Sequence, residues 1–242
     1  MIQVCTGWSP KGRSQYGDTF LNSFDRRWPK EVKLAVWVEE KQPMPRGAWR
    51  DLWSIPGALE FHRTHRDNHE AHGLVPRSNW KQKDIRRGYS FKHDAYKFWK
   101  QILIPGATAN EMRDGEILVW LDGDVVTTHP VPLDFVPRLL GDAEVCYLGR
   151  QPNQHSEIGF WAVRLNPKTR AFLTEMADYY TSGRVFDLPE WHSAYVWDRA
   201  REAANLSERN LCKHRARGHV WPGSPLGALM THNKGPRKGV QR

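Results

Sequence analysis

Two aspartates separated by one glycine follow an apolar run and form the strongest chemical signal in the chain. Asp122 and Asp124 flank Gly123 directly after residues 117–121. We expect the run to be a buried strand whose carboxylates emerge at the sheet edge, where open α/β sheets bind ligands. Carboxylate oxygens suit Mg²⁺ or Mn²⁺, and such an ion commonly holds a diphosphate. The alternative is a polar turn in which Gly123 supplies φ freedom.

A second motif lies near the carboxyl end of the chain. Residues 232–238 read His-Asn-Lys-Gly-Pro-Arg-Lys, a His-x-x-Gly-x-x-Lys pattern. The imidazole of His232 is a suitable third ligand for a divalent ion, and Lys238 can reach the phosphates of the same ligand. Gly235 lets the backbone turn between them. The alternative is a basic tail without fixed structure.

Together the two motifs resemble the metal and diphosphate site of GT-A fold glycosyltransferases, in particular the retaining group with glycogenin and the lipopolysaccharide galactosyltransferases. The resemblance implies a nucleotide-sugar donor, with UDP as the nucleotide we favour, and Mn²⁺ or Mg²⁺. It implies that Asp122 contacts the ribose and the metal, that Asp124 and His232 bind the metal, and that Lys238 holds the departing diphosphate.

The same resemblance implies a single α/β domain over residues 1–242. Its central sheet is expected to be mixed, mostly parallel and flanked by helices. Residues 62–88 are expected to form a long basic, histidine-rich loop, and residues 222–242 a metal- and diphosphate-binding tail. The length leaves room for a sizeable core, and no change of composition requires a second domain.

Elements before the Asp-Gly-Asp motif are expected to border the nucleotide. Residues 2–6 predict a first strand that opens into a loop, which makes Thr6 and Gly7 candidates for donor binding. Residues 32–38 predict a second strand. Residues 89–104 place apolar side chains at helical spacing, and Pro105 is expected to end that helix. Related enzymes carry charged side chains on this helix, and the matching positions are Lys92, Asp94 and Lys97.

Elements after the motif supply the catalytic candidates. Residues 142–149 and 156–166 predict strands, and Glu157, at the entry of the second, is a candidate sugar-contacting carboxylate. The alternative for Glu157 is an ion pair with a nearby arginine. Farther on, Asp187, Glu190 and His192 are candidates for a catalytic base, and Asp187 is also suited to cap a helix that begins there.

The His-x-x-Gly-x-x-Lys motif favours a retaining hexosyltransferase, in which no strong base is required. The region around Glu190 favours the inverting outcome. Two other functions remain open: a nucleotidyltransferase of related fold, and a non-enzymatic nucleic-acid-binding module.

The net charge and the aromatic content bear on which acceptor the protein uses. The net charge is +9 and there are twelve tryptophans. Positive charge favours a polyanionic acceptor such as modified DNA, and aromatic side chains among Lys and Arg suit base stacking. The alternative is that tryptophan fills the core and the charge only aids solubility. No apolar run of transmembrane length or secretory signal is evident, and three scattered cysteines are typical of reduced thiols, so we expect a cytoplasmic protein.

Four histidines recur at helical spacing in residues 62–88, namely His62, His65, His69 and His72. This spacing raises a zinc hypothesis. No cysteine accompanies them, and a solvated histidine face is the commoner arrangement.

Overall fold

A seven-stranded sheet forms the centre of the computed structural model, which describes residues 1–41, 43–44, 48–213 and 217–233. Its strand order is β3-β2-β1-β4-β7-β6-β8. Pairs β1–β2, β1–β4, β2–β3 and β6–β8 are parallel, whereas β7 is antiparallel to both β4 and β6. The predicted mixed, mostly parallel sheet is therefore confirmed. The strands are β1 (Ile2–Trp8), β2 (Lys33–Val38), β3 (Ala48–Asp51), β4 (Ile117–Leu121), β6 (Val145–Leu148), β7 (Glu157–Arg164) and β8 (Glu208–Asn210).

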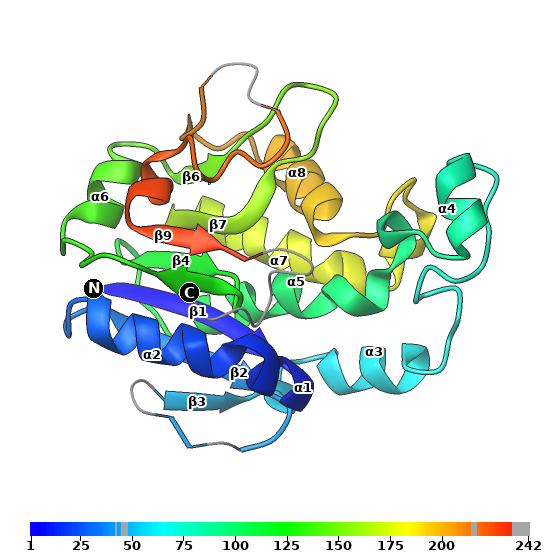
Figure 1. The fold of residues 1–242 in the computed structure, drawn as a ribbon, viewed down its shortest axis with the longest axis horizontal. Helices are drawn as coiled ribbons and strands as arrows, with labels where there is room; N and C mark the ends of the chain where they lie inside the picture. The colour runs from blue at the N-terminus through cyan, green and yellow to red at the C-terminus, as the bar shows by residue number, and fades with distance from the viewer. Residues whose placement is uncertain (42, 45–47, 214–216, 234–242) are drawn as a thin grey trace.

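Helices cover both faces of this sheet (Figure 1). The α-helices are α1 (Pro10–Gly12), α2 (Asp18–Arg27), α3 (Ala58–His65), α4 (Gln82–Arg87), α5 (Ala95–Ala109), α6 (Phe135–Leu140), α7 (Pro167–Thr181) and α8 (Ser193–Ala204). Short 3-10 or π segments are η1 (Arg13–Gly17), η2 (Leu52–Ser54), η3 (Phe91–His93), η4 (Arg184–Asp187) and η5 (Pro225–Ala228). A separate two-stranded sheet joins β5 (Val125–Thr127) to β9 (Met230–His232).

The sheet separates two apolar cores. One packs α3, α5, α7 and α8 against one face, and the other packs α2 and α6 with β5 and β9 against the opposite face. All five residues of β4 are buried because both of its faces are covered. Seven of the twelve tryptophans are among the largest fully buried side chains, including Trp99, Trp161 and Trp197. Most of the tryptophan content thus serves the core.

The helix before β4 differs from the prediction at both ends. Residues 91–93 form a 3-10 turn, α5 begins at Ala95, and it continues through Pro105 to Ala109. A proline inside a helix forfeits one backbone hydrogen bond. Here the residues around Pro105, among them Ile104 and Thr108, are buried, and their burial offsets that loss. The predicted stop at Pro105 was therefore wrong.

The predicted loop over residues 62–88 contains more structure than expected. Its first residues complete α3, and α4 lies near its end. Its histidines make separate contacts: His62 Nδ1 lies 2.7 Å from the Tyr96 hydroxyl, and His72 Nε2 lies 2.9 Å from the Arg66 carbonyl oxygen. Across the described residues, no metal-binding group includes these four histidines. The zinc hypothesis for this segment gains no support.

Within the described ranges, no helix is both long enough and apolar enough to span a bilayer.

Candidate active site

Asp122, Asp124 and His232 converge at the end of β4. Nε2 of His232 lies 3.0 Å from Oδ1 of Asp124 and 3.4 Å from Oδ2 of Asp122. One ligand atom from each residue lies within 4.8 Å of the other two. Two carboxylates and one imidazole at this spacing match the donor set of a Mn²⁺ or Mg²⁺ site.

The short sheet of β5 and β9 brings His232 to the aspartates. His232 pairs with Val125, and the Asn233 amide donates to the Asp124 carbonyl oxygen at 3.1 Å. The side chain of His232 is only 2% exposed. His232 therefore lies in an ordered strand rather than in a loose basic tail.

Gly159 on β7 provides the space for the His232 ring. A Cβ atom at this position would lie 2.4 Å from Cε1 and 2.7 Å from Nδ1 of His232. Such distances are far below van der Waals contact, so any side chain here would displace the imidazole. Gly159 is thus a steric requirement of the site.

Asp122 is held by neighbours on three elements. Its Oδ1 accepts from Trp120 Nε1 at 2.8 Å and from Gln101 Nε2 at 3.0 Å, and its amide donates to the Gly159 carbonyl oxygen at 2.9 Å. These bonds occupy Oδ1 and leave Oδ2 on the side of His232. Such contacts orient metal-binding carboxylates.

Asp-Gly-Asp is also a tight turn, since the Val125 amide donates to the Asp122 carbonyl oxygen at 3.0 Å. The reason for Gly123 is space, however, and not a positive φ. A Cβ on Gly123 would lie 2.9 Å from Trp8 and 3.0 Å from Tyr16. The turn and the carboxylate cluster coexist, so the turn alternative does not exclude the metal hypothesis.

Electrostatics at this cluster favour a cation. Burial opposes the protonation of His232, but Asp122 and Asp124 outweigh that effect and raise its pKa to about 9. The same two carboxylates, after burial, contribute to raising the pKa of Tyr16 to about 12. The two carboxylates thus favour a positive charge at this position, which a divalent metal ion would also supply.

Glu157 lies beside this cluster at the start of β7. It is buried, forms an ion pair with Arg150, and places Oε1 3.6 Å from Nδ1 of His232. Among the residues that the structure describes, that nitrogen has no hydrogen-bond partner. The arginine pair expected as the alternative is therefore present, and the carboxylate also faces the back of the imidazole, where it can fix the ring when Nε2 binds an ion.

A cavity of about 1080 Å³ runs past the cluster. It is lined by Asp122, Asp124, Glu157 and His232 at one side, and by His155, Glu190 and His192 farther along. Lys81, Lys83, Lys97 and Arg199 also line it. A cavity of this size is large enough for a nucleotide sugar with part of a second substrate.

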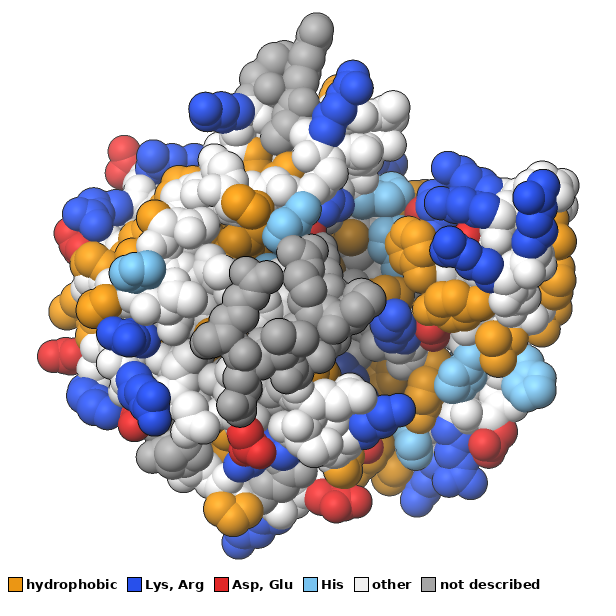
Figure 2. Space-filling model, in the orientation of Figure 1, with side chains coloured by type: hydrophobic (Ala, Val, Ile, Leu, Met, Phe, Trp, Pro, Cys, Tyr) orange, Lys and Arg blue, Asp and Glu red, His pale blue; other side chains and the backbone are white. Residues whose placement is uncertain are grey.

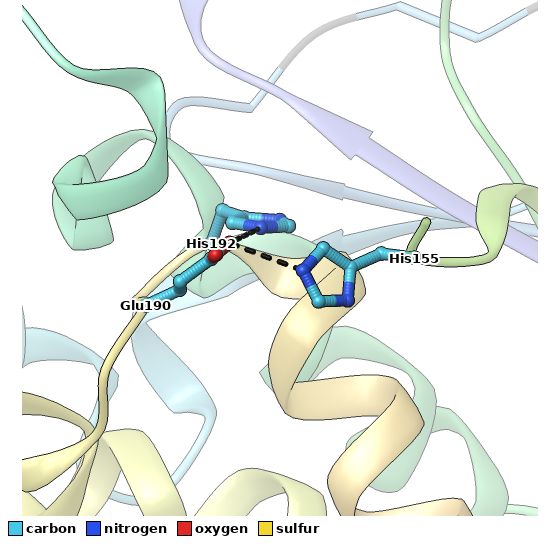
Figure 3. Close-up of side chains that lie close together, drawn as sticks. All are labelled: His155, Glu190 and His192. Atoms are coloured by element: carbon cyan, nitrogen blue, oxygen red, sulfur yellow. Dashed lines mark hydrogen bonds and ion pairs between the residues drawn. The ribbon is translucent and has the colours of Figure 1, made fainter. Parts of the chain in front are cut away.

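The same cavity is also lined by a second group of titratable side chains, His155, Glu190 and His192. Figure 3 shows that these three side chains point toward one another. Oε2 of Glu190 lies 3.1 Å from His155 Nε2 and 2.9 Å from His192 Nε2, while Oε1 pairs with Lys92. Burial alone would raise the pKa of Glu190, but these three partners hold it well below its usual range. Bonds to Asp198 and Glu190 raise the pKa of His155 to about 9, whereas burial lowers that of His192.

The segment around Glu190 differs from the expected helix start. Asp187 ends η4, and α8 begins only at Ser193 with His192 as its N-cap residue. Asp187 does not line the cavity, whereas Glu190 and His192 do. The prediction of a helix opening at Asp187 was wrong, because the Pro189 carbonyl oxygen instead binds His93 and Asn79.

Known proteins of similar structure are glycosyltransferases. No protein-family model and no curated protein sequence matches the chain. The galactosyltransferase LgtC, solved with donor and acceptor sugar analogues, superposes with a TM-score of 0.50 at 10% identity, covering 100% of this chain and 90% of LgtC. The chain has a GT-A-like fold. The resemblance predicted from the sequence is therefore confirmed at the level of the fold.

Two further glycosyltransferases match this GT-A-like chain with lower scores. One takes part in glycosylation of the major capsid of PBCV-1, with a TM-score of 0.44, 13% identity, and coverage of 98% of this chain and 96% of that protein. The other is GlyE of Streptococcus pneumoniae TIGR4, with a TM-score of 0.41, 11% identity, and coverage of 86% and 45%. The chain thus spans less than half the length of GlyE.

Three predicted donor-binding residues lie outside the lining of the cavity. Thr6 is buried, and Gly7 is in β1 rather than in a loop, where a Cβ would lie 2.7 Å from the Trp37 carbonyl oxygen. Asp94 caps α5 by accepting from the Lys97 amide at 3.0 Å and also binds the Tyr89 hydroxyl. In this GT-A-like fold, the contacts given above for Gly7 and Asp94 are with neighbouring residues of the protein rather than with the cavity.

Two other predicted residues, Lys92 and Lys97, line the cavity. Gly235 and Lys238 lie outside the described residues.

Sequence patterns gave no indication of several cavity residues. His155 and Arg150 lie in an irregular connection between β6 and β7, Gln101 is on α5, and Tyr16 is in η1. Gln101 falls within the predicted helix, but its spacing does not set it apart from the other polar residues of α5.

Proposed function

We propose that this protein is a metal-dependent glycosyltransferase that moves a sugar, a hexose in the form we favour, from a nucleoside-diphosphate sugar to an acceptor hydroxyl. The observation that carries the proposal is the cluster of Asp122, Asp124 and His232 at the wall of the large cavity in a GT-A-like fold. UDP is the nucleotide we favour.

The proposed ion is Mn²⁺ or Mg²⁺, held by Asp122, Asp124 and His232. The donor set fits, since it combines two hard carboxylates with one imidazole. When bound, the ion stabilises the negative charge that develops on the leaving diphosphate.

The protein's own groups then orient the donor. Trp120 and Gln101 fix the Asp122 carboxylate, which we assign to the metal and the ribose. Glu157, fixed by Arg150, is assigned to the sugar. We assign Lys238 of the His-x-x-Gly-x-x-Lys motif, which also contains Gly235, to the departing diphosphate, because a lysine supplies a point charge where negative charge accumulates. We also propose that the donor side of the site includes Thr6, Gly7, Lys92 and Asp94. Of these, Lys92 lines the cavity.

The retaining outcome remains the favoured one. Glu190 accepts from three cationic or donor groups, which makes its carboxylate a weak proton acceptor. His192 is the stronger candidate for a base, since burial favours its neutral form. A retaining transfer needs no such base, because the leaving phosphate can take the acceptor proton.

The proposed acceptor is polyanionic, with modified DNA as one example. Lysine and arginine side chains line the cavity, and Lys83, Arg86 and Arg87 are exposed on α4. Figure 2 shows Lys and Arg side chains gathered over the part of the molecule where α4 lies, beside exposed apolar ones. This distribution supports a phosphate-rich partner near the cavity.

Turnover of a panel of nucleotide sugars tests the proposal. The protein is incubated with UDP-, GDP-, CDP- and ADP-sugars and Mn²⁺, with and without DNA containing hydroxymethylated bases, and free nucleoside diphosphate is measured. We expect release from one nucleotide class that stops with EDTA and in Asp124→Asn. A nucleotidyltransferase would instead release the sugar 1-phosphate or pyrophosphate. Metal-independent DNA binding without turnover would contradict the proposal.

A further inference from the structure

We propose that His155, Glu190 and His192 form a second divalent-metal site, and that this site takes Zn²⁺. Their ligand atoms lie within 4.8 Å of one another, and both imidazole Nε2 atoms face the same carboxylate oxygen of Glu190 (Figure 3). This group shares no residue with the Asp122 cluster. Metal binding here goes beyond the proposed function and does not depend on it.

The composition of the two groups predicts different metals. Asp122, Asp124 and His232 offer two carboxylates and one imidazole, whereas this group offers two imidazoles and one carboxylate. Imidazole nitrogen suits zinc and cobalt better than it suits magnesium, and two histidines with one glutamate are a common set of three protein ligands for Zn²⁺. A site with three protein ligands keeps a position for water or substrate.

Contacts around the ligands hold the imidazoles in place. His155 directs Nδ1 at Asp198, whose Oδ2 lies 3.5 Å away, and Asp198 is fixed by the Ser156 amide at 3.0 Å and the Ser156 hydroxyl at 2.6 Å. A carboxylate behind a histidine is typical of metal sites, because it fixes the tautomer that leaves Nε2 for the ion. The ring of His192 packs against Phe91 and Phe98.

The cluster is arranged in the same way as the Asp122 cluster. In both, histidine Nε2 lies about hydrogen-bond distance from a carboxylate oxygen that faces the cavity, and a second carboxylate, Glu157 or Asp198, faces Nδ1 of a histidine. A metal ion that binds such a group takes the place of the hydrogen-bonding proton, which is released. The geometry therefore suits a site whose ligands bond to one another in the absence of the ion.

Lys92 is a positive charge in direct contact with a ligand of the proposed site. It pairs with Oε1 of Glu190 and leaves Oε2 for the imidazoles. A positive charge beside the ligand weakens binding of a dication through repulsion. Removal of this charge should therefore strengthen zinc binding. If Lys92 only held the site together, its removal would weaken zinc binding, so the direction of the change tests the proposal.

The proposed second site lies in the same cavity as the Asp122 cluster. All three ligands line the cavity beyond the Asp122 cluster. An ion there is accessible to an oxygen atom of the second substrate, and this last role rests on the proposed function.

The experiment uses the full chain after treatment with a chelator that is then removed. The Asp122 cluster is disabled by Asp124→Asn combined with His232→Ala, and Co²⁺ is titrated while its visible absorption is followed, with Zn²⁺ then added in competition. We expect one Co²⁺ per chain with the absorption of a four- or five-coordinate site, displaced by one Zn²⁺. In the same background, His192→Ala or His155→Ala should abolish saturable binding, and Lys92→Met should tighten it.

A matched control is His129→Ala, because His129 is exposed and is not among the residues that line the cavity. Thermal unfolding of each variant in EDTA checks the fold. The proposal is overturned if the disabled background binds no Co²⁺, if His192→Ala and His155→Ala both retain binding with unchanged absorption, or if Lys92→Met weakens it. None of these readouts needs sugar transfer, so a failure of the proposed function is seen separately in the turnover assay.

Discussion

Nε2 of His232 lies 3.0 Å from Oδ1 of Asp124 because β9 pairs antiparallel with β5 and sets His232 opposite Val125. The link between the two motifs is therefore a backbone register. Replacing His232 by Ala should leave the sheet intact and remove one metal ligand. We expect the affinity for Mn²⁺ to fall by at least about tenfold, since the loss of a residue that only hydrogen-bonds to a metal ligand already lowers metal affinity by about that factor. Calorimetric titration with Mn²⁺ measures this, with the exposed His129→Ala as a control.

Gly159→Ala should displace the imidazole by steric contact alone. The added methyl would lie 2.4 Å from Cε1 of His232, so the ring must move away from the aspartates. We expect a loss of Mn²⁺ affinity comparable with that of His232→Ala. Gly223→Ala is the matched control, because a Cβ there meets only the Val220 carbonyl oxygen at 3.9 Å. Unchanged affinity in Gly159→Ala would mean that His232 is not a ligand in the position described.

Gln101→Leu tests a residue that acts through Asp122. The amide of Gln101 donates to Oδ1 of Asp122 at 3.0 Å, and its carbonyl accepts from the Ser193 hydroxyl. Loss of these bonds frees the carboxylate to rotate, and we expect Mn²⁺ to bind about 10- to 100-fold more weakly. Gln82→Leu on the exposed surface of α4 is the control. If Gln101→Leu bound Mn²⁺ as tightly as the natural sequence, Gln101 would not orient Asp122 for the metal.

Asp198 should make the stability of the protein depend on pH. Burial opposes its ionisation, but bonds from His155 and Ser156 outweigh that effect and lower its pKa. Its carboxylate therefore stabilises the fold above its unfolded pKa of about 4, and this stabilisation is lost as pH falls through the lower folded value. In urea titrations with EDTA, Asp198→Asn should cost about 1–3 kcal/mol at pH 7 and less below pH ~4. A difference that stays constant over this range would contradict the assignment.

The sheet and the position of Asp122 and Asp124 at its edge were predictable from the sequence because their signals are local. Continuous apolar runs such as residues 117–121 require burial on both faces, and a carboxylate directly after such a run must lie at the sheet edge. His232 was found through its spacing to Gly235 and Lys238, although its partner strand was not.

Other features depend on tertiary contacts that leave no periodic pattern. Pro105 stays helical because its surroundings are buried, which no local propensity indicates. His155 reaches Glu190 from an irregular connection, and its neighbours in sequence carry no motif. The role of Gly159 is to leave room for a ring from another strand, and this can be seen only when both strands are in place.

Metal-dependent binding of a nucleoside diphosphate tests the central claim most directly. Calorimetric titrations of the protein with UDP, GDP, CDP and ADP are run in Mn²⁺ and in EDTA, for the natural sequence and for Asp124→Asn. The account predicts that one of these nucleotides, with UDP favoured, binds in Mn²⁺ and that binding is lost both in EDTA and in Asp124→Asn. Equal affinity in EDTA, or an unchanged affinity in Asp124→Asn, would contradict it.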